Sequence, residues 1–286
     1  MSHAPVLQRP LRVADGIEAF ASRTPTLPPA THTQSYALGT RDVLLVEPAT
    51  PYADEQRAWL DWARGLESRG QKLVGILLTH HHVDHASGAD RFARELDVPL
   101  IAHAETAARL PELVITRSIT DGEELVLEGP TPQSWRVLHT PGHAPGHVCL
   151  FEPTAGAVVV GDMVASEGTI LIETTDGDMA EYLGQLRRLE ALGAKVALPA
   201  HGAPIPEPGR LFAHYVAHRL AREEKVLDAV AGAGGAGITD LGIVPIAYAD
   251  TARAAWPVAL LSVRAHLVKL EREGRTRSDG EKHWAT

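Results

Sequence analysis

The apolar run Leu73-Val74-Gly75-Ile76-Leu77-Leu78 leads directly into Thr79-His80-His81-His82-Val83-Asp84-His85. The run has the length and composition of a buried strand. Four donors, His80, His82, Asp84 and His85, then fall within six positions. Imidazole and carboxylate are the donors that zinc and similar cations prefer. Packing does not explain this crowding, so we predict a metal site at the end of a strand.

Three further donors follow later apolar segments. His143 comes after the segment 135–138, Asp162 after 157–160, and His201 after 196–198. Loops at strand ends let distant parts of a chain converge while the sheet holds them in place. We therefore expect these residues to join the first cluster.

This order of motifs resembles the metallo-β-lactamase-fold hydrolases, and the resemblance covers roughly residues 30–205. It implies that His80, His82 and His143 bind one metal and that Asp84, His85 and His201 bind a second. Asp162 would bridge the two ions. The expected cofactor is two Zn²⁺, with iron or manganese as alternatives. The expected fold is α+β, an αββα sandwich of two sheets.

The expected elements fit such a sandwich. Residues 35–38 and 43–46 predict a hairpin, and helical spacing of apolar residues predicts helices over 53–68 and 86–96. A further helix is expected over 179–192, before the strand 196–198. Residues 1–30 are rich in proline and predict an extended strand or a loop. We place the catalytic domain at residues 1–205 and a small C-terminal domain at 206–286.

The C-terminal part has a different character. A long helix over 211–231 ends at a glycine-rich stretch, 232–237, and a second helical stretch covers 254–274. We expect a small helical unit. With His218-Arg219, Arg222-Glu223 and the stretch 262–274, it resembles the winged-helix-like domain of the lactamase-β-like endoribonuclease branch, which acts on single-stranded RNA. The alternative is an amphipathic helix with no nucleic-acid role.

The composition of the chain narrows the setting of this site. The first residues lack a basic segment followed by an apolar one, and no run has the roughly 18 apolar residues of a membrane span, so we expect a cytoplasmic protein without a membrane partner. The single cysteine, Cys149, excludes an internal disulfide. The net charge of −9 argues against nucleic-acid binding by the whole surface. From Ile205 onward, however, 11 basic residues match 10 acidic ones.

The expected chemistry is hydrolysis. Two cations about 3.5–4 Å apart share a bridging water and lower its pKa from about 15.7 toward 7, which makes hydroxide the nucleophile. We assign Asp84 a double role, as ligand of the second metal and as the catalytic acceptor of the water proton. His81 is expected to support the ligands or face the sheet, and His147 is expected to have a structural or substrate-contact role; neither is expected to bind metal.

Several reactions fit this ligand set. The branches that keep all seven ligands include ribonucleases, thioester hydrolases of the glyoxalase II and acyl-thioesterase kind, and iron persulfide dioxygenases. Residues 31–36 and 46–49 depart from the family's usual Thr-Asn-Thr-Tyr and Val-Asp-Pro-Gly. The sequence favours single-stranded RNA and a small thioester or ester as substrate almost equally. It does not assign a substrate-binding residue. A homodimer is the protein partner considered, and a metal-binding protein without catalysis is the non-enzymatic alternative.

Overall fold

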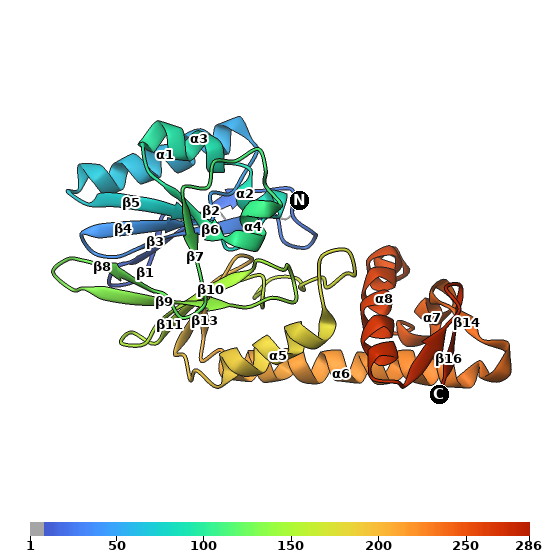
Figure 1. Cartoon of the computed structure of the whole chain (residues 1–286). Coiled ribbons are helices and arrows are strands. Elements are labelled where there is room, and N and C mark those ends of the chain that lie inside the picture. Colours follow the sequence, from blue (N-terminus) through green and yellow to red (C-terminus); the bar gives the residue numbers. More distant parts are fainter. Residues whose placement is uncertain (1–8) are drawn as a thin grey trace, which may run out of the picture. The chain divides into compact units, whose positions relative to one another are not determined.

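Two β-sheets stack face to face in the first of two compact units (Figure 1). The structure, a computed structural model, describes residues 9–286, and our expectation for residues 1–8 lies outside them. The first unit comprises residues up to 140, 146–169 and 194–208. The second comprises residues 141–145, 170–193 and 209–286. The predicted domain boundary between residues 205 and 206 stays a prediction.

The first sheet has seven strands in chain order, antiparallel from β1 to β4 and parallel from β4 to β7. They are β1 (Leu11–Ala14), β2 (Ile17–Arg23), β3 (His32–Leu38), β4 (Asp42–Val46), β5 (Lys72–Leu77), β6 (Leu100–His103) and β7 (Arg117–Ile119). The predicted hairpin is β3–β4. The segment expected to be one strand or a loop instead forms the β1–β2 hairpin, turning at Gly16 with a positive φ of 65°.

Helices connect the parallel strands and cover the outer face of this sheet (Figure 1). They are α1 (Ala53–Ser68), α2 (Val83–Ala86), α3 (Ala89–Leu96) and α4 (Ala104–Ala108). The predicted helix over 53–68 is confirmed. Trp59 of α1 stacks on Phe92 of α3 at 4.0 Å between ring centroids, above the apolar side chains of β4 and β5. This packed layer holds β5 in position, and the histidine cluster follows directly after that strand.

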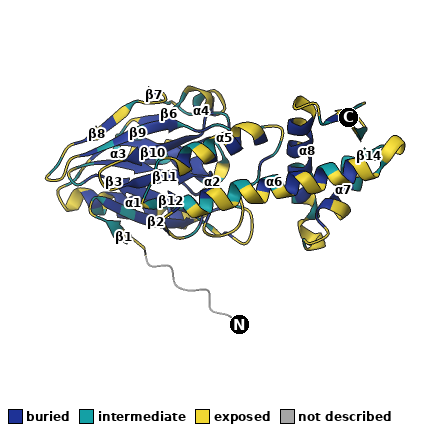
Figure 2. Ribbon diagram, turned by 90° about the horizontal axis from the view of Figure 1, so that it is seen from below, coloured by how far each residue is buried: buried dark blue, intermediate teal, exposed yellow. Residues whose placement is uncertain are grey.

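The second sheet has six strands and packs on the inner face of the first. Its order is β13 (Ile205–Pro206), β12 (Val196–Pro199), β11 (Ala157–Gly161), β10 (Val148–Glu152), β9 (Gln133–His139) and β8 (Glu124–Leu127). Trp135, Val137 and Leu150 face Leu44 and Val46 across the core. Strands β10 and β11 are buried along their whole length, and Figure 2 shows this as dark blue ribbon. The loops that leave β9, β11 and β12 carry the other predicted donors.

The outermost strands of both sheets are short. Strands β1 and β7 at the edges of the first sheet have four and three residues, and β13 and β8 at the edges of the second have two and four. Strands β2 and β3 next to the edge have seven residues each. The exposed edges therefore offer few unpaired backbone groups.

The second unit contains four α-helices, two short 3-10 helices and a three-stranded sheet. The α-helices are α5 (Met179–Glu190), α6 (Gly209–Gly232), α7 (Asp240–Ala247) and α8 (Trp256–Arg272), and the strands are β14 (Ile238–Thr239), β16 (Lys282–Ala285) and β15 (Thr276–Ser278), in that sheet order. Val226, Val230, Val244, Val263 and Leu270 form its core. The expected small C-terminal unit with helices is confirmed, and a three-stranded sheet accompanies its helices. Strands β15 and β16 form a hairpin that carries charged residues on a small sheet and lacks the apolar alternation that marks buried strands.

No helix among residues 9–286 is long and apolar enough to cross a membrane. The cytoplasmic location and the homodimer stay predictions.

Candidate metal centre

The end of β5 places the histidine cluster. Ile76, Leu77 and Leu78 are buried, and the backbone N–H of Leu78 donates to Ile101 O of β6 at 2.9 Å. The chain then leaves the sheet at Thr79, whose carbonyl accepts the N–H of Val148 from the second sheet at 2.9 Å. The short helix α2 follows directly. The cluster is thus held between the two sheets.

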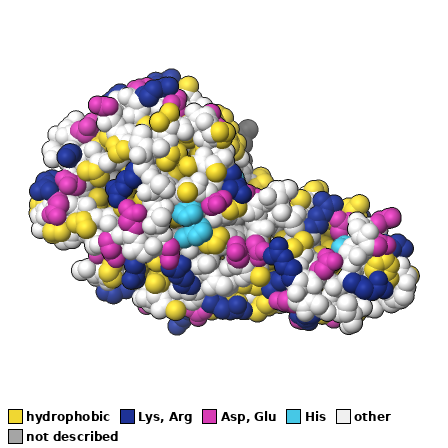
Figure 3. All heavy atoms as spheres, in the orientation of Figure 1, with side chains coloured by type: hydrophobic (Ala, Val, Ile, Leu, Met, Phe, Trp, Pro, Cys, Tyr) yellow, Lys and Arg dark blue, Asp and Glu magenta, His cyan; other side chains and the backbone are white. Residues whose placement is uncertain are grey.

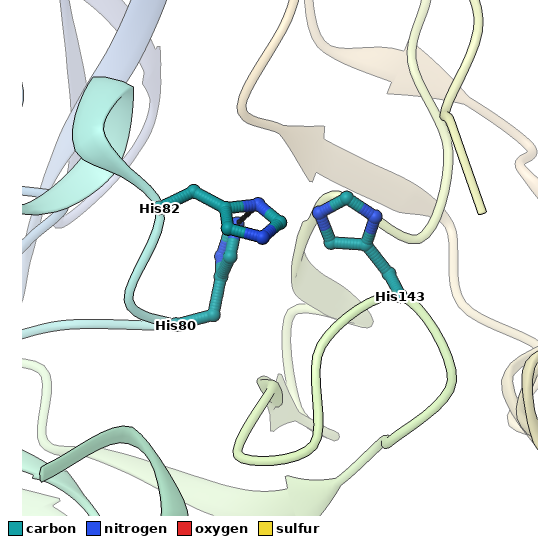
Figure 4. Close-up of side chains that lie close together, drawn as sticks. All are labelled: His80, His82 and His143. Atoms are coloured by element: carbon teal, nitrogen blue, oxygen red, sulfur yellow. Dashed lines mark hydrogen bonds between the residues drawn. The ribbon is translucent and has the colours of Figure 1, made fainter. Parts of the chain in front are cut away.

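His80, His82 and His143 form the first group of candidate ligands. Their ligand atoms lie within 4.8 Å of one another, and the three rings face one another in Figure 4. His80 Nε2 lies 3.0 Å from His82 Nδ1. His143 Nδ1 donates to Leu171 O at 2.9 Å, because a carbonyl oxygen can only accept. That bond selects the tautomer in which Nε2 of His143 is the metal-binding nitrogen.

Asp84, His85 and His201 form the second group, also within 4.8 Å of one another. His85 Nε2 lies 3.7 Å from Asp84 Oδ2 and 3.6 Å from Asp162 Oδ2. His201 Nε2 lies 3.6 Å from Asp84 Oδ2 and 3.3 Å from Asp162 Oδ1. Asp162 is therefore shared between the two histidines.

These separations suit ligands around a cation better than direct hydrogen bonds. A separation of 3.6 Å is too long for a hydrogen bond. Two ligand atoms about 2.0–2.2 Å from a tetrahedral ion lie roughly 3.3–3.6 Å apart. The donor set, imidazole and carboxylate, is also the one that zinc binds. The residues present therefore fit a divalent cation.

The charges of the second group point the same way. Burial alone opposes a charged His85, but the carboxylates of Glu47, Asp84 and Asp162 raise its pKa well above the ordinary value. Burial would also raise the pKa of Asp162, but His201 and His85 hold that pKa well below its usual range. The site gathers three carboxylates in a buried place, an excess of negative charge that a divalent cation would offset.

His147 supports Asp162. The ring is fully buried, its Nδ1 lies 2.8 Å from Thr140 Oγ1, and its Nε2 accepts the backbone N–H of Asp162 at 3.1 Å. The residue before Asp162 is Gly161, where a Cβ would lie 2.5 Å from His147 Nε2. Of the two roles considered from the sequence, this geometry favours a structural one, and the role of His147 stays a prediction.

Glu47 is the supporting residue that sequence reasoning missed. It is 1% exposed, its Oε1 accepts from Thr79 Oγ1, and the same atom lies 3.2 Å from His85 Nδ1. In the sequence, residues 46–49 stand out only as a departure from the family's usual turn. A signal existed, because a glutamate directly after the buried strand β4 must be paired.

The remaining histidines lie outside these two groups, although the ligand atoms of His81, His82 and Asp176 also lie within 4.8 Å of one another. His103 caps α4 by accepting the N–H of Glu105, and its ring stacks on His139 at 4.1 Å. His266 is buried in the second unit, where its Nδ1 lies 3.2 Å from Glu223 Oε2.

The chain is similar to known proteins in both of its parts. Residues 28–201 match the model of the family described as the metallo-beta-lactamase superfamily, and residues 239–284 match the beta-lactamase associated winged helix domain. A beta-lactamase-like protein 2 homolog of Drosophila melanogaster is 31% identical over 221 residues, which cover 74% of this chain and 73% of that protein.

A second relative carries an activity in its name. An atrochrysone carboxyl ACP thioesterase of Paecilomyces divaricatus is 34% identical over 201 residues, 69% of this chain, but the match spans only 59% of that protein. Among solved structures, a metallo-beta-lactamase family protein of Thermus thermophilus has a TM-score of 0.76 at 23% identity, covering 95% of this chain and 99% of that one. At that identity the likeness shows the fold alone.

Proposed function

Because the chain belongs to the metallo-beta-lactamase superfamily and is a hydrolase of that fold, we propose that it is a dinuclear metal-dependent hydrolase of acyl thioesters. The observation that carries the proposal is the pair of ligand groups, each within 4.8 Å, at the ends of strands from both sheets. The proposed ligands are His80, His82, Asp84, His85, His143, Asp162 and His201. When bound, a pair of divalent cations would act as a Lewis acid and lower the pKa of water toward about 7.

The side chains around this site have separate tasks. Asp84 keeps 14% of its side chain exposed, so its carboxylate is both near His85 and His201 and open to solvent. It is the group we assign to hold the attacking water and accept its proton. Asp162, more deeply placed at 10% exposure, sets the spacing between His85 and His201.

The thioester is favoured over RNA for two reasons. The relatives with an activity in their names include acyl carrier protein thioesterases. A ribonuclease holds phosphates with a track of basic residues, whereas Figure 3 shows basic and acidic side chains mixed over the visible face. Single-stranded RNA stays the alternative substrate because of the match to a winged helix domain.

The test compares the two substrates directly. Zinc-loaded protein is assayed with an acyl-pantetheine thioester and with a short single-stranded RNA, and Asp162→Ala serves as the control for contaminating activity. Thioester turnover that this change abolishes would support the proposal. RNA cleavage abolished by the same change, with no thioester turnover, would replace the thioester by a phosphodiester. Turnover that persists in Asp162→Ala would contradict the proposed site.

A further inference from the structure

One turn of α6 carries three buried ionisable residues of the second unit. Arg219, Arg222 and Glu223 are 6%, 9% and 2% exposed. Burying an ionisable group is unfavourable unless partners offset the lost hydration. The partners of these three residues therefore show what this turn is for.

Two of the three residues join α6 to its neighbouring helices. Arg222 donates to Ala247 O at the end of α7 and to Asp250 Oδ1 at 2.9 Å. Glu223 accepts from Lys269 Nζ of α8 at 2.6 Å and contacts His266 of the same helix. These contacts hold the helices of the second unit together and do not reach the segment of His143.

Arg219 has a different partner. Its Nη2 donates to Ile170 O, and its guanidinium lies 5.6 Å from the centroid of the Tyr182 ring. Ile170 lies within the segment 162–178, which has no regular secondary structure and connects β11 to α5. Arg219 thus holds a point in a loop rather than another helix.

That loop holds the segment of His143. The next carbonyl, Leu171 O, accepts the Nδ1–H of His143 at 2.9 Å. At the far end of the loop, the N–H of Asp178 donates to Gly142 O at 2.9 Å. Gly142 has a φ of 125°, and a Cβ on it would lie 2.3 Å from Tyr182 N, so the segment fits closely against the start of α5. The ring orientation of His143 depends on where the loop is held.

We propose that Arg219 is a positioning residue for His143. By fixing the Ile170 carbonyl it fixes the adjacent Leu171 carbonyl, which in turn holds His143 in the tautomer and orientation that present Nε2 to a metal. The inference rests on the proposed function only in taking His143 as a metal ligand. Groups that hydrogen-bond a metal-binding histidine change metal affinity by about 10–100-fold when removed. Arg219 acts one residue further away, so we expect the lower end of that range.

The experiment measures cobalt(II) binding and the visible absorption of the cobalt-loaded full chain, without substrate. Arg219→Gln should weaken one of two bound cobalt equivalents about 10-fold and alter the spectrum. Arg222→Gln is the matched control, because it removes a buried arginine of the same helix that contacts α7 instead. It should lower the melting temperature but leave cobalt affinity and spectrum unchanged. Arg219→Lys keeps a donor for Ile170 O and should regain most of the affinity.

The role of His143 is tested by combining changes. His143→Ala should weaken one cobalt equivalent, and adding Arg219→Gln to it should weaken cobalt binding no further, because both act through one ring. Equal weakening by Arg219→Gln and Arg222→Gln, or full additivity with His143→Ala, would overturn the inference. If Arg219→Gln does not fold, Arg219→Met, which also removes the donor, is compared with Arg222→Met, and equal cobalt affinities would overturn the inference.

The two proposals fail in different ways. Unchanged cobalt binding in His143→Ala would overturn the proposed metal site, and this inference with it. Unchanged binding in Arg219→Gln beside weakened binding in His143→Ala would overturn the inference alone. Absence of thioester turnover would count against the substrate while leaving the cobalt results in force.

Discussion

Replacement of Glu223 by glutamine should destabilise the second unit by about 2–3 kcal/mol. Glu223 is 2% exposed, and its carboxylate contacts Lys269 at 2.6 Å and His266 at 3.2 Å. Removing one partner of a buried ion pair costs about 3–5 kcal/mol, because the other charge is left without compensation. Lys269 here retains a second partner, Glu273 Oε1 at 2.8 Å, so we expect a loss below that range.

The neighbouring residue provides the control. Glu224 has 58% of its side chain exposed and pairs with Arg275 at 2.9 Å. Exposed pairs contribute about 0.2–1 kcal/mol, so Glu224→Gln should cost less than about 1 kcal/mol. Urea denaturation followed by tryptophan fluorescence compares both variants, since Trp256 and Trp284 lie in the second unit. Equal losses of unfolding free energy in the two variants would refute the reasoning.

Three further predictions concern pH, the catalytic acid–base group and one glycine. Burial opposes ionisation of Glu223, but hydrogen bonds from α8 lower its pKa in the folded protein. The ionised carboxylate therefore stabilises the fold above the unfolded pKa of about 4.3. This stabilisation is lost as the pH falls through the lower pKa of the folded state. The urea midpoint of the wild type should therefore fall more steeply than that of Glu223→Gln as the pH is lowered below about 5. Asp84→Asn should reduce kcat for the thioester by about 100-fold or more while bound metal, measured by elemental analysis, falls far less; full turnover would exclude its role. Gly142→Ala would place a Cβ 2.3 Å from Tyr182 N and should weaken both cobalt binding and the stability of the fold. Gly184→Ala is the control, because nothing lies within 4 Å of its Cβ position, and it should stabilise α5 by up to about 1 kcal/mol.

The sequence predicted the parts of the site that depend on strand ends. Apolar runs located β5, β9, β11 and β12, and a donor directly after a run lies at the edge where the loops of a sheet meet. This is why His80, Asp162 and His201 could be named from the order of residues alone. Their roles as ligands stay predictions, although the structure groups the ligand atoms of the histidines and places Asp162 beside His85 and His201.

What the sequence did not predict depends on contacts between distant segments. Glu47 reaches His85 because the chain adopts a φ of 61° after β4, a backbone conformation that no local pattern announces for a glutamate. The partner of Arg219 is a backbone carbonyl 49 positions away in an irregular segment. The β15–β16 hairpin did carry a signal, Asp279-Gly280 at its turn, but the charged residues on either side of it do not indicate strands.

The short outer strands of the sandwich have a consequence for self-association. A long, flat edge strand is a template on which a second copy can add its own strand, and this is a common route to aggregation. Here β1, β7, β8 and β13 have two to four residues each, so a second chain would find few backbone donors and acceptors in line. If two copies of this chain pair, we expect side chains rather than a continuous intermolecular sheet to hold them together, and the monomer should resist fibril formation.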